Sequence, residues 1–187
     1  MKKVLVFLLS TMMVFAALGC GGEKKEDAAS VEVKDALEIL TTAWDNFDEE
    51  NKFYAAGGGY NNMVDDAPGT VDVTDTDSLT VLYAFPEDSM DLIDDAASLM
   101  HGMNANTFTA AAYHVKNSGD VQTLADGLKD SIMNKQWMCG FPEIMFVASI
   151  GSDYVVSCVG NTDLVNEFKT QITEAYSAVM IHEESIM

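Results

Sequence analysis

Cys20 has the sequence setting that most clearly indicates a chemical modification. It directly follows Ala17, Leu18 and Gly19, which is the pattern of residues found before the cysteine of a bacterial lipobox. In such a motif the thiol receives a diacylglycerol, the preceding residues are cleaved off, and the new amino terminus can be acylated. We therefore predict that Cys20 is a lipidation site. The alternative is an ordinary signal peptide in which Cys20 is a thiol without this role.

Cys139 and Cys158 are the two remaining cysteines. Outside the cytoplasm, where disulfides persist, they could pair. Cys158 lies in a strand-like run and Cys139 lies just before the preceding run, so the sequence does not decide whether their Cα atoms come within the required distance of about 7 Å. They are not in a C-x-x-C arrangement, which disfavours a redox enzyme. We predict a possible disulfide between them, with two free thiols as the alternative.

The histidines and the aspartate-rich loop do not have the spacing of a known metal site. His101, His114 and His182 fall on separate predicted elements and form neither H-E-x-x-H nor a related zinc motif. A calcium loop that begins at Asp72 or Asp75 would need glycine at its sixth position and glutamate at its twelfth, and the sequence has neither. We therefore predict no metal site and no cofactor.

No catalytic residue can be nominated from the sequence. The chain lacks Gly-x-Ser-x-Gly, and Ser149 to Ser152 fall in a predicted hairpin with no histidine nearby in sequence. Gly57 to Gly59 are not followed by the Lys-Ser/Thr pair of a phosphate loop, so we predict a flexible glycine segment there. Whether the protein is an enzyme stays undecided, and a protein that is not an enzyme is favoured.

The amino-terminal segment predicts export and anchoring. Lys2 and Lys3 precede an apolar run from Val4 to Phe15, which suits the core of a signal peptide and is shorter than the roughly 20 residues of a membrane-spanning helix. We divide the chain into a lipoprotein signal peptide (1–19), a lipidated cysteine with a flexible tether (20–30) and one folded domain (31–187). The predicted location is the extracytoplasmic face of the cell membrane, with the lipid as the membrane contact.

The charge of the chain excludes one class of partner. The whole chain has a formal charge of −20, and the signal peptide contributes two lysines and no acid, so the mature protein is near −22. All of the basic residues are lysines, so no arginine is present to hold a phosphate in a bidentate clamp. Such a surface repels nucleic acid. We predict no nucleic-acid partner and allow a protein partner or a small ligand, for which a cation is electrostatically suitable.

Hydrophobic periodicity predicts an α+β domain. Apolar residues at helical spacing predict three main helices, alternating or continuous apolar runs predict four strands, and Phe53 to Asp77 is irregular. The predicted helices are Val31 to about Asp48, a segment from Ser118 to about Trp137, and a segment from Asn161 to about Val179. A short helix is predicted after Asp77, and the predicted strands are Asp94 to Met103, Thr107 to Val115, Ile144 to Ile150 and Tyr154 to Val159.

These elements form the order hairpin-helix twice, after an amino-terminal helix. The simplest architecture is a four-stranded, mainly antiparallel sheet with helices packed on one face, in the order ββα-ββα. Asp94 to Met103 is rich in alanine and methionine and is compatible with a helix by propensity. We predict a strand there, partly because Asn104 to Asn106 favour a hairpin turn into the next strand and partly because of the family resemblance described next.

Several segments also resemble a family of small lipoproteins of Gram-positive bacteria that is known only as a domain of unknown function. The similarity covers about Val31 to Ala178, and Gly57 to Asp77 has no counterpart in it. It implies the hairpin-helix fold, agrees with the lipobox, and supplies no catalytic residues. The segments that carry the resemblance are Ala111 to Lys116, Ser118 to Asp120, Lys135 to Trp137, Phe141-Pro142 and Gly151 to Val155.

Together these observations favour a membrane-anchored extracytoplasmic lipoprotein that acts as a binding or interaction module and is not an enzyme. Two alternatives remain at this point. One is an extracytoplasmic thiol, redox or hydrolytic enzyme that uses Cys139 and Cys158 or residues brought together by folding. The other is a calcium-binding lipoprotein that uses the acidic residues between Asp65 and Asp91.

Overall fold

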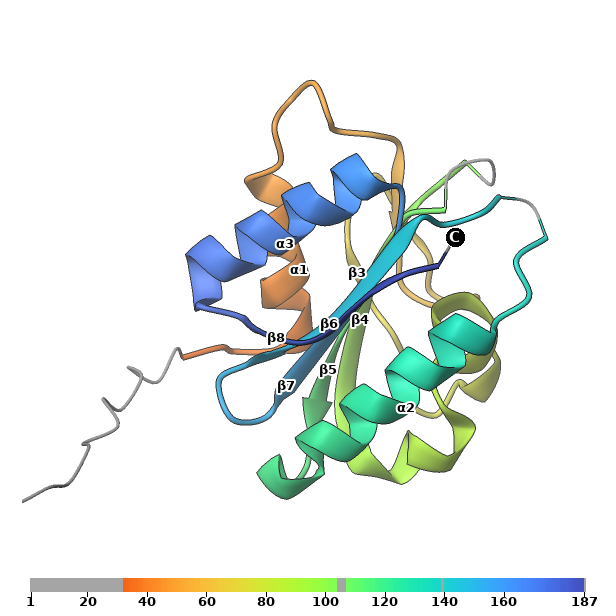
Figure 1. Cartoon of the computed structure of the whole chain (residues 1–187), viewed down its shortest axis with the longest axis vertical. Helices are drawn as coiled ribbons and strands as arrows, with labels where there is room; N and C mark the ends of the chain where they lie inside the picture. The colour runs from red at the N-terminus through yellow and green to blue at the C-terminus, as the bar shows by residue number, and fades with distance from the viewer. Residues whose placement is uncertain (1–31, 104–106, 139, 187) are drawn as a thin grey trace, which may run out of the picture.

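The computed structural model describes residues 32–103, 107–138 and 140–186, which form one antiparallel eight-stranded sheet with helices on both faces (Figure 1). The strands lie in the order β2-β1-β4-β5-β7-β6-β8, and β3 also pairs with β4. The strands are β1 (Ala55–Gly57), β2 (Val64–Asp65), β3 (Gly69–Thr70), β4 (Ile93–His101), β5 (Thr109–Val115), β6 (Ile144–Ile150), β7 (Tyr154–Gly160) and β8 (Val179–Ser185). The helices are α1 (Ala36–Asp45), α2 (Val121–Asn134) and α3 (Thr162–Tyr176), with short helical turns η1 (Ser78–Leu82), η2 (Glu87–Leu92) and η3 (Ser118–Asp120).

The α+β class and the order of the main elements are confirmed. β4, β5, β6 and β7 are the four predicted strands, and each hairpin is followed by its predicted helix, α2 or α3. The predicted strand at Asp94 to Met103 is confirmed as β4, which ends at His101 and pairs with β5, with an irregularity in the register between Ile93 and Asp95. The segment that has helical propensity is therefore held in a strand by tertiary pairing. The predicted turn at Asn104 to Asn106 lies outside the described residues.

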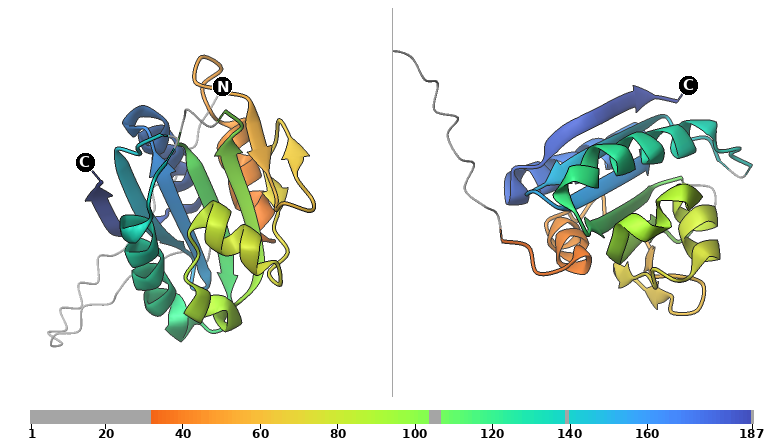
Figure 2. Two further views of the ribbon diagram at one scale, coloured as in Figure 1. Left: turned by 90° about the vertical axis from the view of Figure 1, so that its right-hand side faces the viewer. Right: turned by 90° about the horizontal axis from the view of Figure 1, so that it is seen from below.

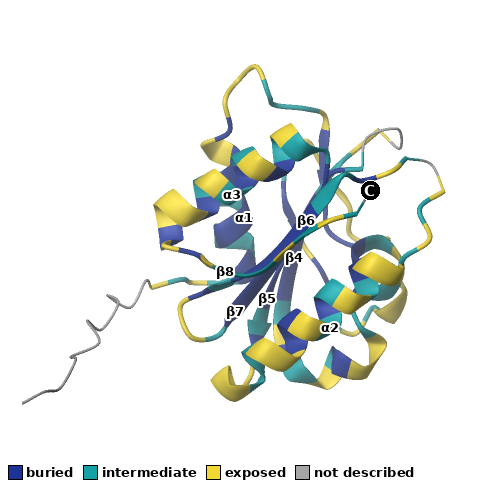
Figure 3. Cartoon of the chain, viewed as in Figure 1, coloured by how far each residue is buried: buried dark blue, intermediate teal, exposed yellow. Residues whose placement is uncertain are grey.

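The prediction that the helices pack on one face is wrong. α1 and α3 cover one face of the sheet and α2 with η1 covers the other, so the sheet forms the middle layer (Figure 2, left). The reason is visible in β7, where all seven residues are buried. A strand whose alternate side chains are apolar on both sides must be covered on both sides. Each helix has a buried side (Figure 3), and its buried apolar residues belong to one of the two cores beside the sheet.

The sheet also has four more strands than predicted. β1, β2 and β3 come from the segment that was expected to be irregular, and each is only two or three residues long. Such short strands show no periodicity in the sequence, because they form by pairing with one another and with β4. β8 follows α3 and pairs with β6 at the edge of the sheet, so Val179 begins a strand and does not end the last helix.

The predicted flexible glycine segment is a packed structure. Gly57 belongs to β1, and a Cβ built on it would lie 2.1 Å from the backbone nitrogen of Gly69 on β3. Gly58 has φ of +85°, which favours glycine. Its amide donates to the buried Ser98 hydroxyl at 2.9 Å, and its carbonyl accepts from the Tyr83 hydroxyl. Glycine is needed here because backbone lies against backbone, and the segment is not a flexible linker.

Within the described part of the chain, no helix combines the length and the apolar character that crossing a bilayer requires.

Candidate functional site

A cleft of about 1140 Å³ opens at one end of the sheet, on the face covered by α1 and α3. It lies where α1 begins, β4 begins, β5 ends, the β6–β7 hairpin turns and α3 ends. Its polar lining consists of Glu32, Lys34, Asp35, Asp94, Asp95, His114, Ser152, Asp153, Tyr154, Tyr176 and Ser177. Because these residues come from five separate elements, only the folded chain brings them together.

Strand register places the floor of the cleft. His114 is the neighbour of Asp95 on β4 and of Tyr154 on β7, and directly paired residues point to the same face of a sheet. The imidazole of His114 lies against the phenol ring of Tyr154, with ring centroids 5.0 Å apart. These three side chains therefore form a row across β4, β5 and β7.

His114 bridges two carboxylates. Its Nδ1 lies 2.5 Å from Oδ1 of Asp94, and its Nε2 lies 3.6 Å from Oδ2 of Asp153 in the β6–β7 turn. Partial burial of the ring works against the charged form, but the hydrogen bond to Asp94 and the charges of Asp94 and Asp153 outweigh it, so the pKa of His114 is raised. The charged imidazole is thus the form that this end of the sheet favours.

Two of the carboxylates also cap the amino-terminal end of α1. Asp35 accepts a hydrogen bond from the Glu38 amide at 2.8 Å, and Asp95 accepts one from the Ala36 amide at 2.7 Å. They satisfy amide groups that the first turn of a helix leaves unpaired. The Glu38 amide lowers the pKa of Asp35, which keeps this carboxylate charged. The acidic end of the sheet and the start of α1 are therefore a single structural unit.

The other helix at the cleft contributes partial negative charge. α3 ends at Tyr176, and its last turn contains no basic residue. The carboxyl end of a helix attracts cations. Burial, followed by the nearby aspartates, raises the pKa of Tyr154 to about 12, so its hydroxyl stays neutral. Five carboxylates and a helix carboxyl end thus face a single lysine, Lys34, and one histidine. Such a cleft suits a positively charged ligand.

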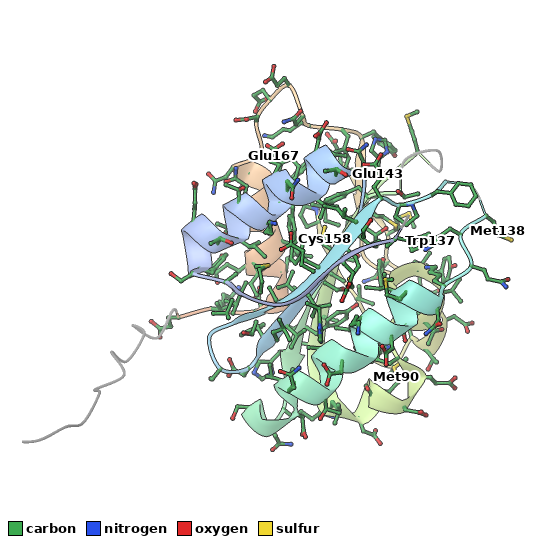
Figure 4. All side chains as sticks on the ribbon, viewed as in Figure 1. Met90, Trp137, Met138, Glu143, Cys158 and Glu167 are labelled. Carbon is green, nitrogen blue, oxygen red and sulfur yellow. The ribbon has the colours of Figure 1, made fainter. Side chains whose placement is uncertain are left out.

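The predicted cysteine sites lie elsewhere or outside the described residues. Cys20 and Cys139 are outside the described residues. Cys158 lies on β7 and is fully buried in the core below α1 and α3 (Figure 4). Burial raises the pKa of the Cys158 thiol well above its ordinary value, which disfavours a nucleophilic thiolate. The lipidation of Cys20 and the pairing of Cys139 with Cys158 stay predictions.

The other histidines are not brought to the cleft. His101 on β4 stacks on Phe53 with centroids 4.7 Å apart, and His182 on β8 lies 2.7 Å from Asp126 on α2. Sequence reasoning treated all three histidines alike and singled out neither Asp94 nor Asp153. The signal that could have found them was the register of the predicted hairpins, since acids at the start of one strand must face the end of the next.

The aspartate-rich loop uses its carboxylates to build turns. Asp72 accepts hydrogen bonds from the amide and hydroxyl of Thr74, and Asp75 accepts them from the amide and hydroxyl of Ser78. Among the described residues, no group of three or more His, Cys, Asp or Glu side chains is arranged to hold a metal ion. The geometry of this loop is that of local turn formation.

No family model, no curated protein and no solved structure matches this chain.

Proposed function

We propose that the protein is a lipid-anchored binding module on the extracytoplasmic face of the membrane, and that it holds a cationic organic ligand in the acidic cleft. The observation that carries the ligand class is the lining of the cleft, where five carboxylates face one lysine. The anchoring part of the proposal rests on the lipobox at Cys20 and on the signal peptide before it.

The form of the cleft favours an organic amine over a bare metal ion. Its carboxylates are spread over several elements, and among the described residues no group of three or more His, Cys, Asp or Glu side chains is arranged to hold a metal ion. At about 1140 Å³ the cleft is slightly larger than typical small-molecule sites, which run to about 1,000 Å³. A ligand with several separated positive charges could reach several of these carboxylates at once.

The proposed anchor would keep this site near the membrane. Glu32 lines the cleft and lies only twelve residues after Cys20. Even a fully extended chain of that length spans at most about 40 Å. The proposed module would therefore take up its ligand in a zone within roughly that distance of the bilayer surface.

Binding of an acetylated, amidated tetralysine peptide tests the proposed ligand class, because the charge of this peptide does not change between pH 5 and 9. We expect the mature chain with Cys20→Ala, which needs no detergent, to bind it at low ionic strength. Asp94→Asn with Asp153→Asn is expected to weaken binding about tenfold, which corresponds to about 1.4 kcal/mol for two partly exposed charges. Calorimetric titration measures both affinities.

The matched control removes two carboxylates outside the cleft. Asp130 and Glu50 are both exposed and line no part of the cleft, so Asp130→Asn with Glu50→Gln changes the net charge equally. We expect this variant to bind the peptide within about twofold of the unsubstituted cleft, since exposed charges at a distance are screened. Equal losses in the two double variants would show a diffuse attraction to an acidic surface and would refute the proposed site.

A further inference from the structure

We propose that His114 is a built-in competitor for the cationic ligand: when protonated it neutralises Asp94 and Asp153, and when it loses its proton it releases both carboxylates to the ligand. This inference rests on the proposed function, because it assigns a regulator to the same cleft. It makes ligand affinity rise with pH in a range where the cationic ligand keeps its own charge.

The first support is the position of the imidazole between its two partners. Nδ1 lies 2.5 Å from Asp94 on β4 and Nε2 lies 3.6 Å from Asp153 in the β6–β7 turn. Both ring nitrogens can donate at once only in the charged form. The imidazolium therefore occupies the place between these carboxylates that an ammonium group of a ligand would seek.

The second support is that His114 links two separate elements at the cleft, β4 and the β6–β7 turn. Asp94 is the second residue of β4. Asp153 lies in the β6–β7 turn, and its carbonyl oxygen accepts a hydrogen bond from the Val115 amide at 2.7 Å. The His114 side chain is 29% exposed, whereas the side chains of Asp94 and Asp153 are 51% and 43% exposed. The histidine thus lies deeper than its partners, whose carboxylates remain within reach of a ligand in the cleft.

The charged and titratable groups around His114 determine how ligand affinity changes with pH. β4 contributes Asp94 and Asp95, the β6–β7 turn contributes Asp153, and β7 contributes Tyr154. From the other side of the cleft, the chain before α1 contributes Glu32, Lys34 and Asp35, and the end of α3 contributes Tyr176.

Among these groups, histidine is the side chain whose charge ordinarily changes between pH 5.5 and 8.5. Partial burial works against the charged imidazole, but the hydrogen bond to Asp94 and the charges of Asp94 and Asp153 raise the pKa of His114. Competition is therefore strongest below that raised pKa and is lost as the pH rises through it.

Linkage gives two measurements of the same coupling. If protonated His114 weakens ligand binding, then bound ligand must lower the pKa of His114 by the same free energy. We expect the tetralysine peptide to bind the mature chain with Cys20→Ala at least fivefold more tightly at pH 8.5 than at pH 5.5, which is the lower end of the 5–150-fold typical of coupled sites. NMR titration of the His114 ring is expected to show its pKa falling when the peptide is bound.

His114→Asn is the variant that isolates the histidine. We expect it to remove most of the pH dependence and to bind the peptide more tightly than unsubstituted His114 does at pH 5.5. Peptide binding that is sensitive to the Asp94 and Asp153 substitutions but independent of pH would overturn this inference and leave the proposed function standing. A pH dependence of peptide binding that persists in His114→Asn would likewise overturn this inference and leave the proposed function standing.

Absence of binding at every pH would instead refute the proposed function. The NMR titration needs no substitution at His114, so it decides the question even if His114→Asn does not fold. An unchanged pKa of His114 on saturation with the peptide would overturn the inference.

Discussion

Replacing Gly57 by alanine is expected to destabilise the domain by about 3 kcal/mol, at the upper end of the cost of overpacking. The added Cβ would lie 2.1 Å from the Gly69 nitrogen, 2.5 Å from the Pro68 carbonyl carbon and 2.7 Å from the Ala67 oxygen. All three are backbone atoms, so relief requires β1 and β3 to move apart beside β4. Thermal unfolding should show a midpoint lower by roughly 6–12 °C, since each kcal/mol lowers it by about 2–4 °C in a domain of this size.

Gly119 provides the matched control for this substitution. A Cβ built there meets no atom within 4 Å. Gly119→Ala is therefore expected to change the stability by no more than about 0.5 kcal/mol, as exposed substitutions usually do. Equal midpoints for Gly57→Ala and Gly119→Ala would show that the close contact between β1 and β3 is not a structural requirement.

Replacing Cys20 by alanine is expected to change the location of the protein almost completely. Each buried methylene of a lipid contributes about 0.8 kcal/mol to membrane binding, and stable anchoring takes two chains or an equivalent second signal. The mature protein is near −22, so its net charge provides no attraction to an anionic membrane surface. We expect Cys20→Ala to abolish labelling by a palmitate analogue and to move the protein out of the membrane fraction.

Cys139→Ala is the control for the anchor, because Cys139 does not follow a lipobox. It is expected to keep full labelling and full membrane association. If Cys20→Ala were labelled as strongly as the unsubstituted protein, the predicted lipidation site would be wrong. Loss of labelling with unchanged membrane association would mean that something other than the lipid holds the protein there.

The sequence predicted the central elements because each of them is long enough for a periodic pattern. Leu124, Leu128 and Ile132 mark the buried side of α2 at helical spacing, and all of them are buried in the structure. The two long hairpins were also recognisable from their turns and apolar runs. These patterns depend on local sequence, so they indicate which element forms and say much less about the face on which it packs.

The parts of the fold that the sequence did not predict depend on contacts between segments that are distant in the chain. The backbones of Gly57 and Gly69 lie in close contact, which no local sequence pattern indicates, and Gly57 to Gly59 were therefore predicted to be a flexible segment. β8 is recognisable only by its pairing with β6, because Glu183 and Glu184 give it no strong apolar pattern. The prediction of helices on one face failed for the same reason, since layer order is a property of the whole sheet.

The candidate site was missed because its residues are ordinary when taken one at a time. His114 has no motif around it, and Asp94, Asp95 and Asp153 lie at strand ends where acids are common. Only the pairing of β5 with β4 and β7 makes them neighbours. The start of α1 and the end of α3 then complete the cleft from elements more than a hundred residues apart.

The central claim is that a cation binds at this end of the sheet, and mapping the contact by NMR tests it most directly. The tetralysine peptide is added at low salt to the mature chain with Cys20→Ala while its amide signals are followed. We predict that the largest shifts fall on Asp94, Asp95, His114 and the Gly151 to Tyr154 turn. Shifts spread evenly over the acidic surface, or concentrated at an end of the sheet away from the cleft, would contradict the account.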